Sequence, residues 1–159
     1  MISDPEIEGY LEESELFLRC NGADVLAPVC TEINSKQPEF TPIAYSWNGL
    51  TVEQVELLYE TILVLYYALS KLAKINLPTF RRHTITQNVK DFTSFIRYIN
   101  LEAKDNQADV GSFRFIQNPV LLKYAASCLN MIEDLPATTV GSYMAIIKAI
   151  DDHLTNNQR

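Results

Sequence analysis

Apolar residues recur at steps of three and four along most of this chain, which is the spacing of one face of an α-helix. The run from Thr84 is the most regular, with apolar side chains at Ile85, Val89, Phe92, Ile96, Ile99 and Ala103. A second run from Val55 to Leu72 is apolar on every side in its middle, which places that helix at the centre of the fold. The pattern predicts an all-α protein, an antiparallel bundle of about five helices.

Capping signals set the expected helix boundaries. Ser3-Asp4-Pro5-Glu6 has a Ser cap, an early Pro and a Glu three residues after the cap, so the first helix begins there and ends near Asn21-Gly22. Thr51-Val52-Glu53-Gln54 is a second capping box, and its helix is expected to run to about Ile75, before Pro78. Asn118-Pro119 begins a fourth helix that ends before Pro136, and a fifth begins at Thr138 or Thr139.

The remaining segments are expected to be loops within one domain. Residues 1–46 would form an acidic N-terminal helix and a Pro-containing loop, and residues 47–159 the helical bundle. Pro28, Pro38 and Pro42 leave room for one short helical turn at 29–33, followed by a loop at 34–42. Asp105 to Ser112 is predicted to be a polar loop.

Composition favours a soluble protein of the cytoplasm. Three cysteines, Cys20, Cys30 and Cys128, form no CxxC or Cys/His cluster, which favours small buried thiols in a reducing compartment over disulfides or zinc. The N-terminus is acidic where a signal peptide would be basic. The most apolar stretch, Ile62 to Leu69, is much shorter than the roughly 20 residues that span a bilayer.

No catalytic motif is found, so neither an enzyme nor a cofactor is expected. The sequence has no phosphate-binding glycine loop, no GxSxG, no HExxH and no calcium loop. Its two histidines, His83 and His153, are far apart in sequence. Asp151-Asp152-His153 could offer oxygen and nitrogen ligands to a metal, but adjacent helical residues point about 100° apart, and a solvated helix end is the preferred interpretation.

Charge is strongly segregated along the chain. The net charge is −7, yet nine of the thirteen basic residues lie in residues 71–124. Residues 1–40 carry nine acidic side chains against Arg19 and Lys36. Such asymmetry bears on the choice of partner rather than on the fold.

The basic residues of the third helix recur every seven positions. His83, Lys90, Arg97 and Lys104 would form a row on the flank of the helix, about 10 Å apart at 1.5 Å per residue. A row of cations at that spacing can follow a sugar–phosphate backbone without reading bases. The candidate nucleic-acid-binding residues are Lys71, Lys74, Arg81, Arg82, Lys90, Arg97 and Lys104, and the first four could cluster at one end of the row.

The same charges can also arise without any nucleic-acid partner. Lys71 and Lys74 end a helix, where cations offset the helix dipole. The basic flank could be a solvated face, or it could pair with the acidic first helix or with an acidic protein. Phe80, Tyr98 and Phe113, with Phe115, are interleaved aromatics that could stack on bases or pack in the core.

Two segments of the chain carry a resemblance to a known protein family. Trp47-Asn48-Gly49-Leu50-Thr51 precedes a long tyrosine-rich helix, and Arg81-Arg82-His83-Thr84 opens another. Over about residues 45–155 the chain resembles the C-terminal helical domain of the large subunit of type I-D CRISPR effectors, which is also produced separately as a small subunit. The resemblance implies several copies in an RNA-guided complex, with the basic residues on the guide RNA and target DNA backbones.

A second hypothesis comes from a different class of function. The chain would be a helical protein-interaction module of the inhibitor or immunity type, binding a basic protein through its acidic first helix. Glu8, Glu12 and Glu15 would carry that contact.

Overall fold

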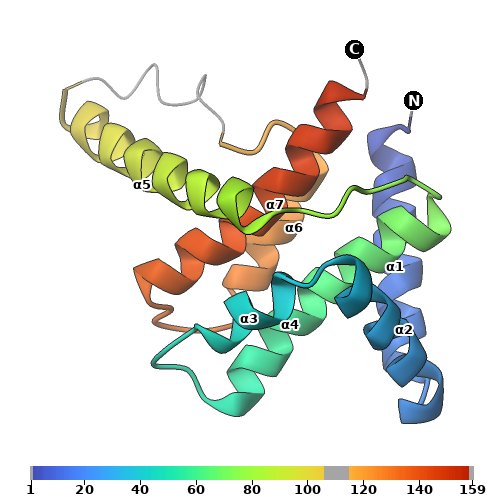
Figure 1. Cartoon of the computed structure of the whole chain (residues 1–159). Coiled ribbons are helices and arrows are strands. Elements are labelled where there is room, and N and C mark those ends of the chain that lie inside the picture. The colour runs from blue at the N-terminus through green and yellow to red at the C-terminus, as the bar shows by residue number, and fades with distance from the viewer. Residues whose placement is uncertain (1, 106–114, 158–159) are drawn as a thin grey trace.

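The fold is a bundle of helices, as expected from the periodicity of the sequence (Figure 1). A computed structural model describes residues 2–105 and 115–157, without the side chains of residues 101–105. No strand occurs within those ranges. The elements are α1 (Asp4–Cys20), α2 (Ala23–Lys36), α3 (Phe40–Tyr45), α4 (Val52–Tyr67), the π-helix η1 (Ala68–Leu72), α5 (Arg82–Asp105), α6 (Pro119–Leu129) and α7 (Ala137–Asn156).

Helix α1 has the boundaries that its capping residues predict. The backbone N–H of Ser3 donates to the Glu6 carboxylate at 2.7 Å, and Pro5 lies in the first turn. The helix ends at Cys20, and the side-chain amide of Asn21, the capping residue that follows, donates to the carbonyl of Phe17. Its inner face packs against α4, η1 and α6, so the N-terminal segment contributes to the same core as the rest of the described chain.

The prediction of a loop between residues 34 and 42 is wrong. Residues 23–46 form two helices, α2 and α3, separated by three residues around Pro38. Pro42 falls in the first turn of α3, where a missing N–H costs nothing. Ile33 and Phe40 are almost fully buried, so tertiary packing stabilises these helices although Pro28 interrupts the hydrogen bonding of α2.

Helix α4 begins as predicted, but its end differs. The Thr51 hydroxyl accepts from the N–H of Gln54 at 3.2 Å, and the Gln54 side chain accepts from the N–H of Thr51 at 2.9 Å. Regular α-helix was expected to about Ile75, yet it stops at Tyr67 and continues as η1 only to Leu72. The chain then leaves the helix through Lys74, which has a φ of 55°.

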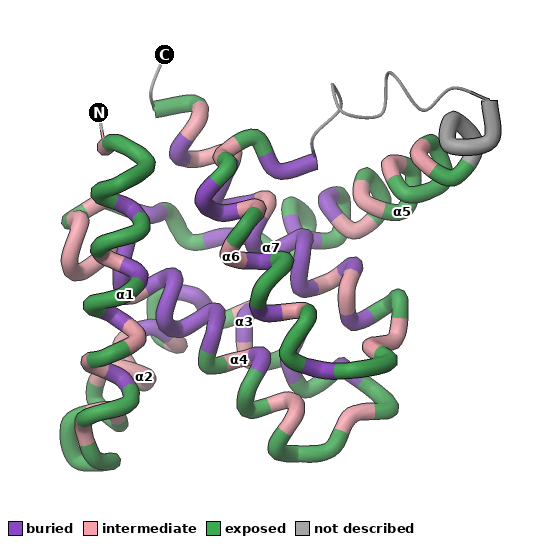
Figure 2. The backbone as a smooth tube through the Cα atoms, turned by 180° about the vertical axis from the view of Figure 1, so that it is seen from behind, coloured by how far each residue is buried: buried purple, intermediate pink, exposed green. Residues whose placement is uncertain are grey.

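Helices α4 and α7 form the centre of the bundle. The hydroxyls of Thr61 and Tyr143 lie 2.8 Å apart, and the Tyr124 hydroxyl donates to the Thr61 carbonyl at 2.8 Å. The longest buried runs of these helices are residues 61–66 of α4 and 143–147 of α7, and purple segments of both meet in the middle of the bundle (Figure 2). The central position of α4 was predicted from its sequence. Helix α7 is buried on more sides than the single apolar seam predicted for it.

Helix α6 begins at the predicted cap and ends early. The Asn118 side chain accepts from the N–H groups of Val120 and Leu121. The helix stops at Leu129 instead of continuing toward Pro136. Ile132 is buried, but it lies in the turn that follows the helix. Among the described residues, no helix has the length and apolar character needed to cross a membrane.

Candidate nucleic-acid interface

Helix α5 is held to the bundle along one face by α7. Ile85 is 3% exposed, and the buried Asn88 side chain donates to the carbonyl of Ala145 at 3.1 Å. Phe92 faces Gly141 of α7, and a Cβ at Gly141 would be in ordinary van der Waals contact with the Phe92 ring, at 3.6 Å. These contacts fix the rotation of α5 about its axis, and with it the direction of every side chain on the helix.

The outer end of α5 projects from the body of the molecule. Both views show its C-terminal half extending beyond the other helices (Figures 1 and 2). The exposed fractions agree, because Ile96 and Tyr98 are 39% and 38% exposed. Side chains on this half of the helix are therefore accessible over more than one face.

The buried face of α5 differs from the seam predicted for it. Ile96 was expected inside but is exposed, while Phe95 packs beside Phe92 against the ring of Phe115. The buried face is therefore still a three-and-four stripe centred on Phe92, but it runs through Asn88 and Phe95 instead of Ile96. Sequence periodicity missed this because Phe115 comes from a distant segment and contacts both phenylalanines.

The basic row lies opposite that buried face. Lys90 precedes Phe92 by two residues, so the two side chains point about 160° apart around the helix. His83, Lys90 and Arg97 are all exposed. The row is therefore turned to solvent, not set on a flank beside the core as the sequence suggested. Lys104 lies in α5 among the residues whose side chains are outside the described structure.

Lys90 and Arg97 have no ion-pair partner among the described residues. The nearest acidic side chain in sequence, Asp91, accepts a hydrogen bond from Gln87. In the described part of the chain, α1 pairs instead with Lys123, through Glu8 at 3.2 Å, and with its own Arg19. The pairing of the basic row with the acidic first helix, which the sequence left open, is absent from these contacts.

Two further arginines stand at the beginning of α5. Arg81 and Arg82 are exposed and lack an ion pair within the described structure, and the first turn of α5 contains no acidic residue. Cations at a helix N-terminus are disfavoured by the helix dipole, so a contribution to helix stability does not explain the position of these two arginines. Together with the free N–H groups with which an α-helix begins, they favour an anion at this end of the row.

Lys71 and Lys74 do not join this group. Six residues, 75–80, lie between Lys74 and Arg81 in the non-helical segment that runs from the end of η1 to the start of α5 (Figure 1). Gln37, fully buried, holds this segment by donating to the Pro78 carbonyl at 2.7 Å and accepting from the Phe80 N–H at 3.0 Å. The single cluster of four cations that the sequence allowed is therefore not formed.

Lys71 forms an ion pair with Glu32. It shares the Glu32 carboxylate with Lys36, and both lie at the ends of their helices. Hydrogen bonds from Lys36 and then Lys71 lower the pKa of Glu32 to about 2. Lys71 is thus a structural partner, whereas Lys74 is exposed and unpaired within the described chain.

Two of the interleaved aromatic residues belong to the core. Phe80 and Phe115 are 6% and 8% exposed, so neither ring can stack on a base. Tyr98 is the exposed aromatic of the row, beside Arg97. Phe113 lies outside the described residues.

The Asp151-Asp152-His153 group is not a solvated helix end. Asp151 is fully buried and accepts from the N–H groups of Gln117 and Asn118 at 2.8 and 2.9 Å. Asp152 pairs with Lys148, and the His153 ring contacts Asn157. Lys148 also lies 3.9 Å from Asp151, so the two aspartates share one lysine, and no cluster of three metal-ligating groups occurs in the described residues. The burial of Asp151 has no signal in the sequence, because its partners come from a distant turn.

The cysteines differ in their surroundings. Cys128 is 5% exposed beside Tyr124 and Tyr143, and burial raises the pKa of its thiol. Burial also raises the pKa of Cys30, which is partly covered, whereas Cys20 is exposed. Low thiolate content at Cys128 and Cys30 disfavours nucleophilic chemistry at either residue.

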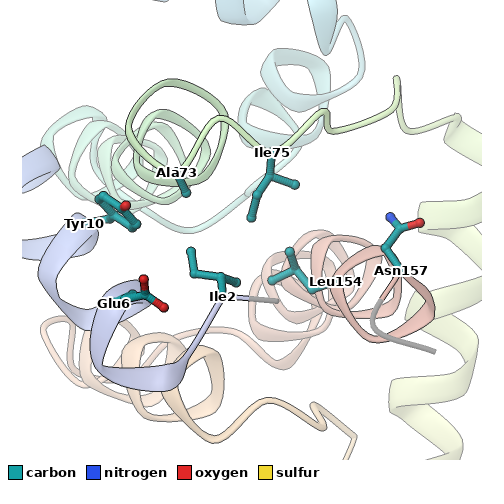
Figure 3. Close-up of a pocket in the computed structure, with 7 residues that line it drawn as sticks. All are labelled: Ile2, Glu6, Tyr10, Ala73, Ile75, Leu154 and Asn157. Atoms are coloured by element: carbon teal, nitrogen blue, oxygen red, sulfur yellow. The ribbon is translucent and has the colours of Figure 1, made fainter.

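A cavity of about 390 Å³ lies where the start of α1, the end of η1 and the end of α7 meet (Figure 3). Ile2, Ile75 and Leu154 point into it in the close-up. Its ionisable side chains in the described structure are Glu6 and Tyr10. Hydrogen bonds from Ser3 occupy the Glu6 carboxylate and lower its pKa. This lining pairs no nucleophile with a general base.

No family model, no curated protein and no solved structure matches this chain. The geometry of its own residues is what bears on its function.

Proposed function

We propose that this protein is a non-catalytic helical subunit that binds nucleic-acid backbone through the exposed face of α5. The observation that carries the proposal is the row of His83, Lys90 and Arg97, opposite the packed face and unpaired within the described structure, with two arginines at its N-terminal end. Lys90 and Arg97 stand about 10 Å apart along the helix. That spacing covers about three phosphates of one strand, at 3.4 Å each along the axis.

The proposed contact is electrostatic and independent of sequence. Side chains on one straight face reach phosphates, while base recognition needs groups that enter a groove or stack on bases. Tyr98 beside Arg97 offers one stacking surface for an unpaired base. A net charge of −7 repels a polyanion from the rest of the surface and limits affinity. Weak contacts of this kind suit a subunit that is held in place by a larger assembly.

The resemblance to type I-D CRISPR subunits supplies the proposed assembly. In such a complex the guide RNA provides sequence specificity, and protein subunits contact backbone by shape and charge. The protein would then act in the cytoplasm, in several copies beside other effector subunits, on guide RNA or target DNA. Genomic position tests this part: a reading frame far from any CRISPR locus would count against the assembly while leaving the α5 interface standing.

The interface itself is tested by salt titration with two matched double variants. Lys90→Gln with Arg97→Gln removes two exposed cations from the row, and Arg19→Gln with Lys123→Gln removes two from elsewhere, at 66% and 76% side-chain exposure. Fluorescein-labelled single-stranded DNA, RNA and duplex DNA are titrated by anisotropy over a range of KCl concentrations. The α5 variant is expected to lower the slope of log affinity against log salt by about 1.4 for single strands or 1.8 for duplex.

The control variant is expected to keep the wild-type slope, because its cations lie off the row. Equal slopes for the wild type and the α5 variant would reject the interface. Far-ultraviolet circular dichroism checks that both variants keep their helicity, which is expected because all four side chains are exposed.

A second candidate function is supported by α1. Glu12 and Glu13 are exposed and unpaired among the described residues, and Leu16 beside them is 64% exposed. We propose as the alternative that this face binds a basic protein. Neutralising Glu8, Glu12 and Glu15 together would then abolish a stable protein complex and leave nucleic-acid binding unchanged.

A further inference from the structure

A small apolar groove lies between α3 and the beginning of α4, away from the outer end of α5 (Figure 1). Its volume is about 220 Å³, and Tyr45, Leu50, Val52 and Val55 line it together with Tyr59. That volume is below the roughly 300 to 1,000 Å³ of small-molecule sites. The groove therefore suits a large side chain of a polypeptide better than a free metabolite.

The groove carries two of the most exposed large apolar side chains in the described structure. Tyr45 is 82% exposed and Val52 is 70% exposed, and both line the same cavity. Single exposed apolar residues are common on protein surfaces, but these two border the same apolar depression, which makes it a candidate interaction site. Tyr is also enriched among the residues that dominate binding energy in protein interfaces.

The floor of the groove is held rigidly. The Tyr59 hydroxyl donates to the Asn34 side chain at 2.5 Å and lies 2.9 Å from the Thr41 hydroxyl. This network joins α2, α3 and α4 beneath the exposed residues. A preformed site loses less conformational entropy when a partner docks than a mobile one does.

The charge around the groove is negative and uncompensated. Glu56 lines it, and Glu53 and Glu60 follow the same side of α4 at steps of three and four. All three are exposed, and none forms an ion pair among the described residues. No Lys or Arg occurs between residues 37 and 70. Nucleic acid and anionic membranes are repelled by such a surface.

We propose that the α3–α4 groove docks a cationic segment of a protein partner, in which one large apolar side chain is flanked by Lys or Arg. The apolar side chain enters between Tyr45 and Val52, and the flanking cations face Glu53 and Glu56. This surface is separate from α5, so the proposal does not depend on nucleic-acid binding.

The test uses the full chain and three labelled peptides of equal length. The first has a Leu-Trp centre flanked by lysines, the second the same centre flanked by glutamates, and the third the same lysines around a Ser-Ser centre. Anisotropy titrations are expected to show saturable binding of the first peptide alone. Tyr45→Ser and Val52→Ser are each expected to weaken it at least about tenfold.

Matched controls come from outside both acidic helix faces. Met131→Ser removes another exposed apolar side chain, 47% exposed, after α6. It is expected to leave the affinity within about twofold. Glu53→Gln with Glu56→Gln is expected to weaken binding, whereas Glu133→Gln with Asp134→Asn, two exposed acids without an ion pair among the described residues, is not.

Three results would overturn the proposal. They are no binding of the first peptide, equal binding of the third peptide, and equal losses at Met131 and Tyr45. Sedimentation of the free chain adds a fourth: a dimer that Tyr45→Ser dissociates would assign the groove to a second copy. Because Lys90→Gln with Arg97→Gln is expected to leave peptide binding unchanged, failure here is distinguishable from failure of the α5 interface.

Discussion

The buried carboxylate of Asp151 accepts a hydrogen bond of 2.9 Å from the backbone N–H of Asn118, the residue that caps α6. Its other oxygen accepts from the N–H of Gln117 at 2.8 Å. The side chain of Asn118 in turn accepts from the first N–H groups of α6. One side chain near the end of α7 thus fixes where and in which direction α6 begins.

Removing that carboxylate is expected to destabilise the fold. Asp151→Ala leaves two partly buried backbone N–H groups without acceptors, which costs about 2 to 4 kcal/mol of unfolding free energy. Urea denaturation measures the loss. Asp152→Ala is the control, because its side chain is 46% exposed and pairs only with Lys148. Similar losses in the two variants would contradict the role assigned to the Asp151 hydrogen bonds at the turn.

Glu32 is expected to make stability depend on acid pH. The hydrogen bonds from Lys36 and Lys71 lower the pKa of this carboxyl from its ordinary value of 4.5 to about 2 in the folded chain. Because the folded pKa is depressed, the stabilisation is present above pH 4.5 and disappears as pH falls toward 2. Glu32→Gln should therefore lower the unfolding free energy at pH 6 and match the wild type near pH 2.

Urea titrations across that pH range check the effect. Glu13→Gln serves as the control, since Glu13 is exposed and has no ion pair in the described structure. A difference between wild type and Glu32→Gln that stays constant down to pH 2 would contradict the role assigned to the two lysines.

Lys74 is expected to carry backbone strain. Its φ of 55° is in the left-handed region, which costs a residue with a side chain about 1 kcal/mol relative to glycine. Lys74→Gly should raise the unfolding free energy by about that amount, whereas Lys74→Ala should not, because alanine keeps the Cβ. Thermal and urea unfolding of the two variants measure the difference. If the two variants are equally stable, the turn at the end of η1 is not strained.

Helix formation in the bundle could be predicted well, and helix length less well. The starts of α1, α4 and α6 follow from local capping residues, since a cap depends on side chains within three positions. Helices α2 and α3 were missed because their stability comes from burying Ile33 and Phe40 against the rest of the core, while prolines mark the local sequence as a loop. The π-turn of η1 likewise has no local signal.

The same division holds for the candidate site. Heptad spacing places His83, Lys90 and Arg97 on one face of a helix whatever the fold, because helical geometry alone decides it. Whether that face is free depends on the partner of α5. Phe115 draws both Phe92 and Phe95 inward, which turns the cations outward and exposes Ile96.

By itself, then, the sequence determined that the chain is helical, where several helices begin, and which cations share a helical face. These properties depend on residues within one or two turns of each other. Tertiary structure alone decided that Asp151 is buried, that Lys71 pairs with Glu32 away from Arg81, and that Tyr45 and Val52 meet at one groove. Each of these relations joins residues from different elements, and only the packing of the whole chain brings such residues together.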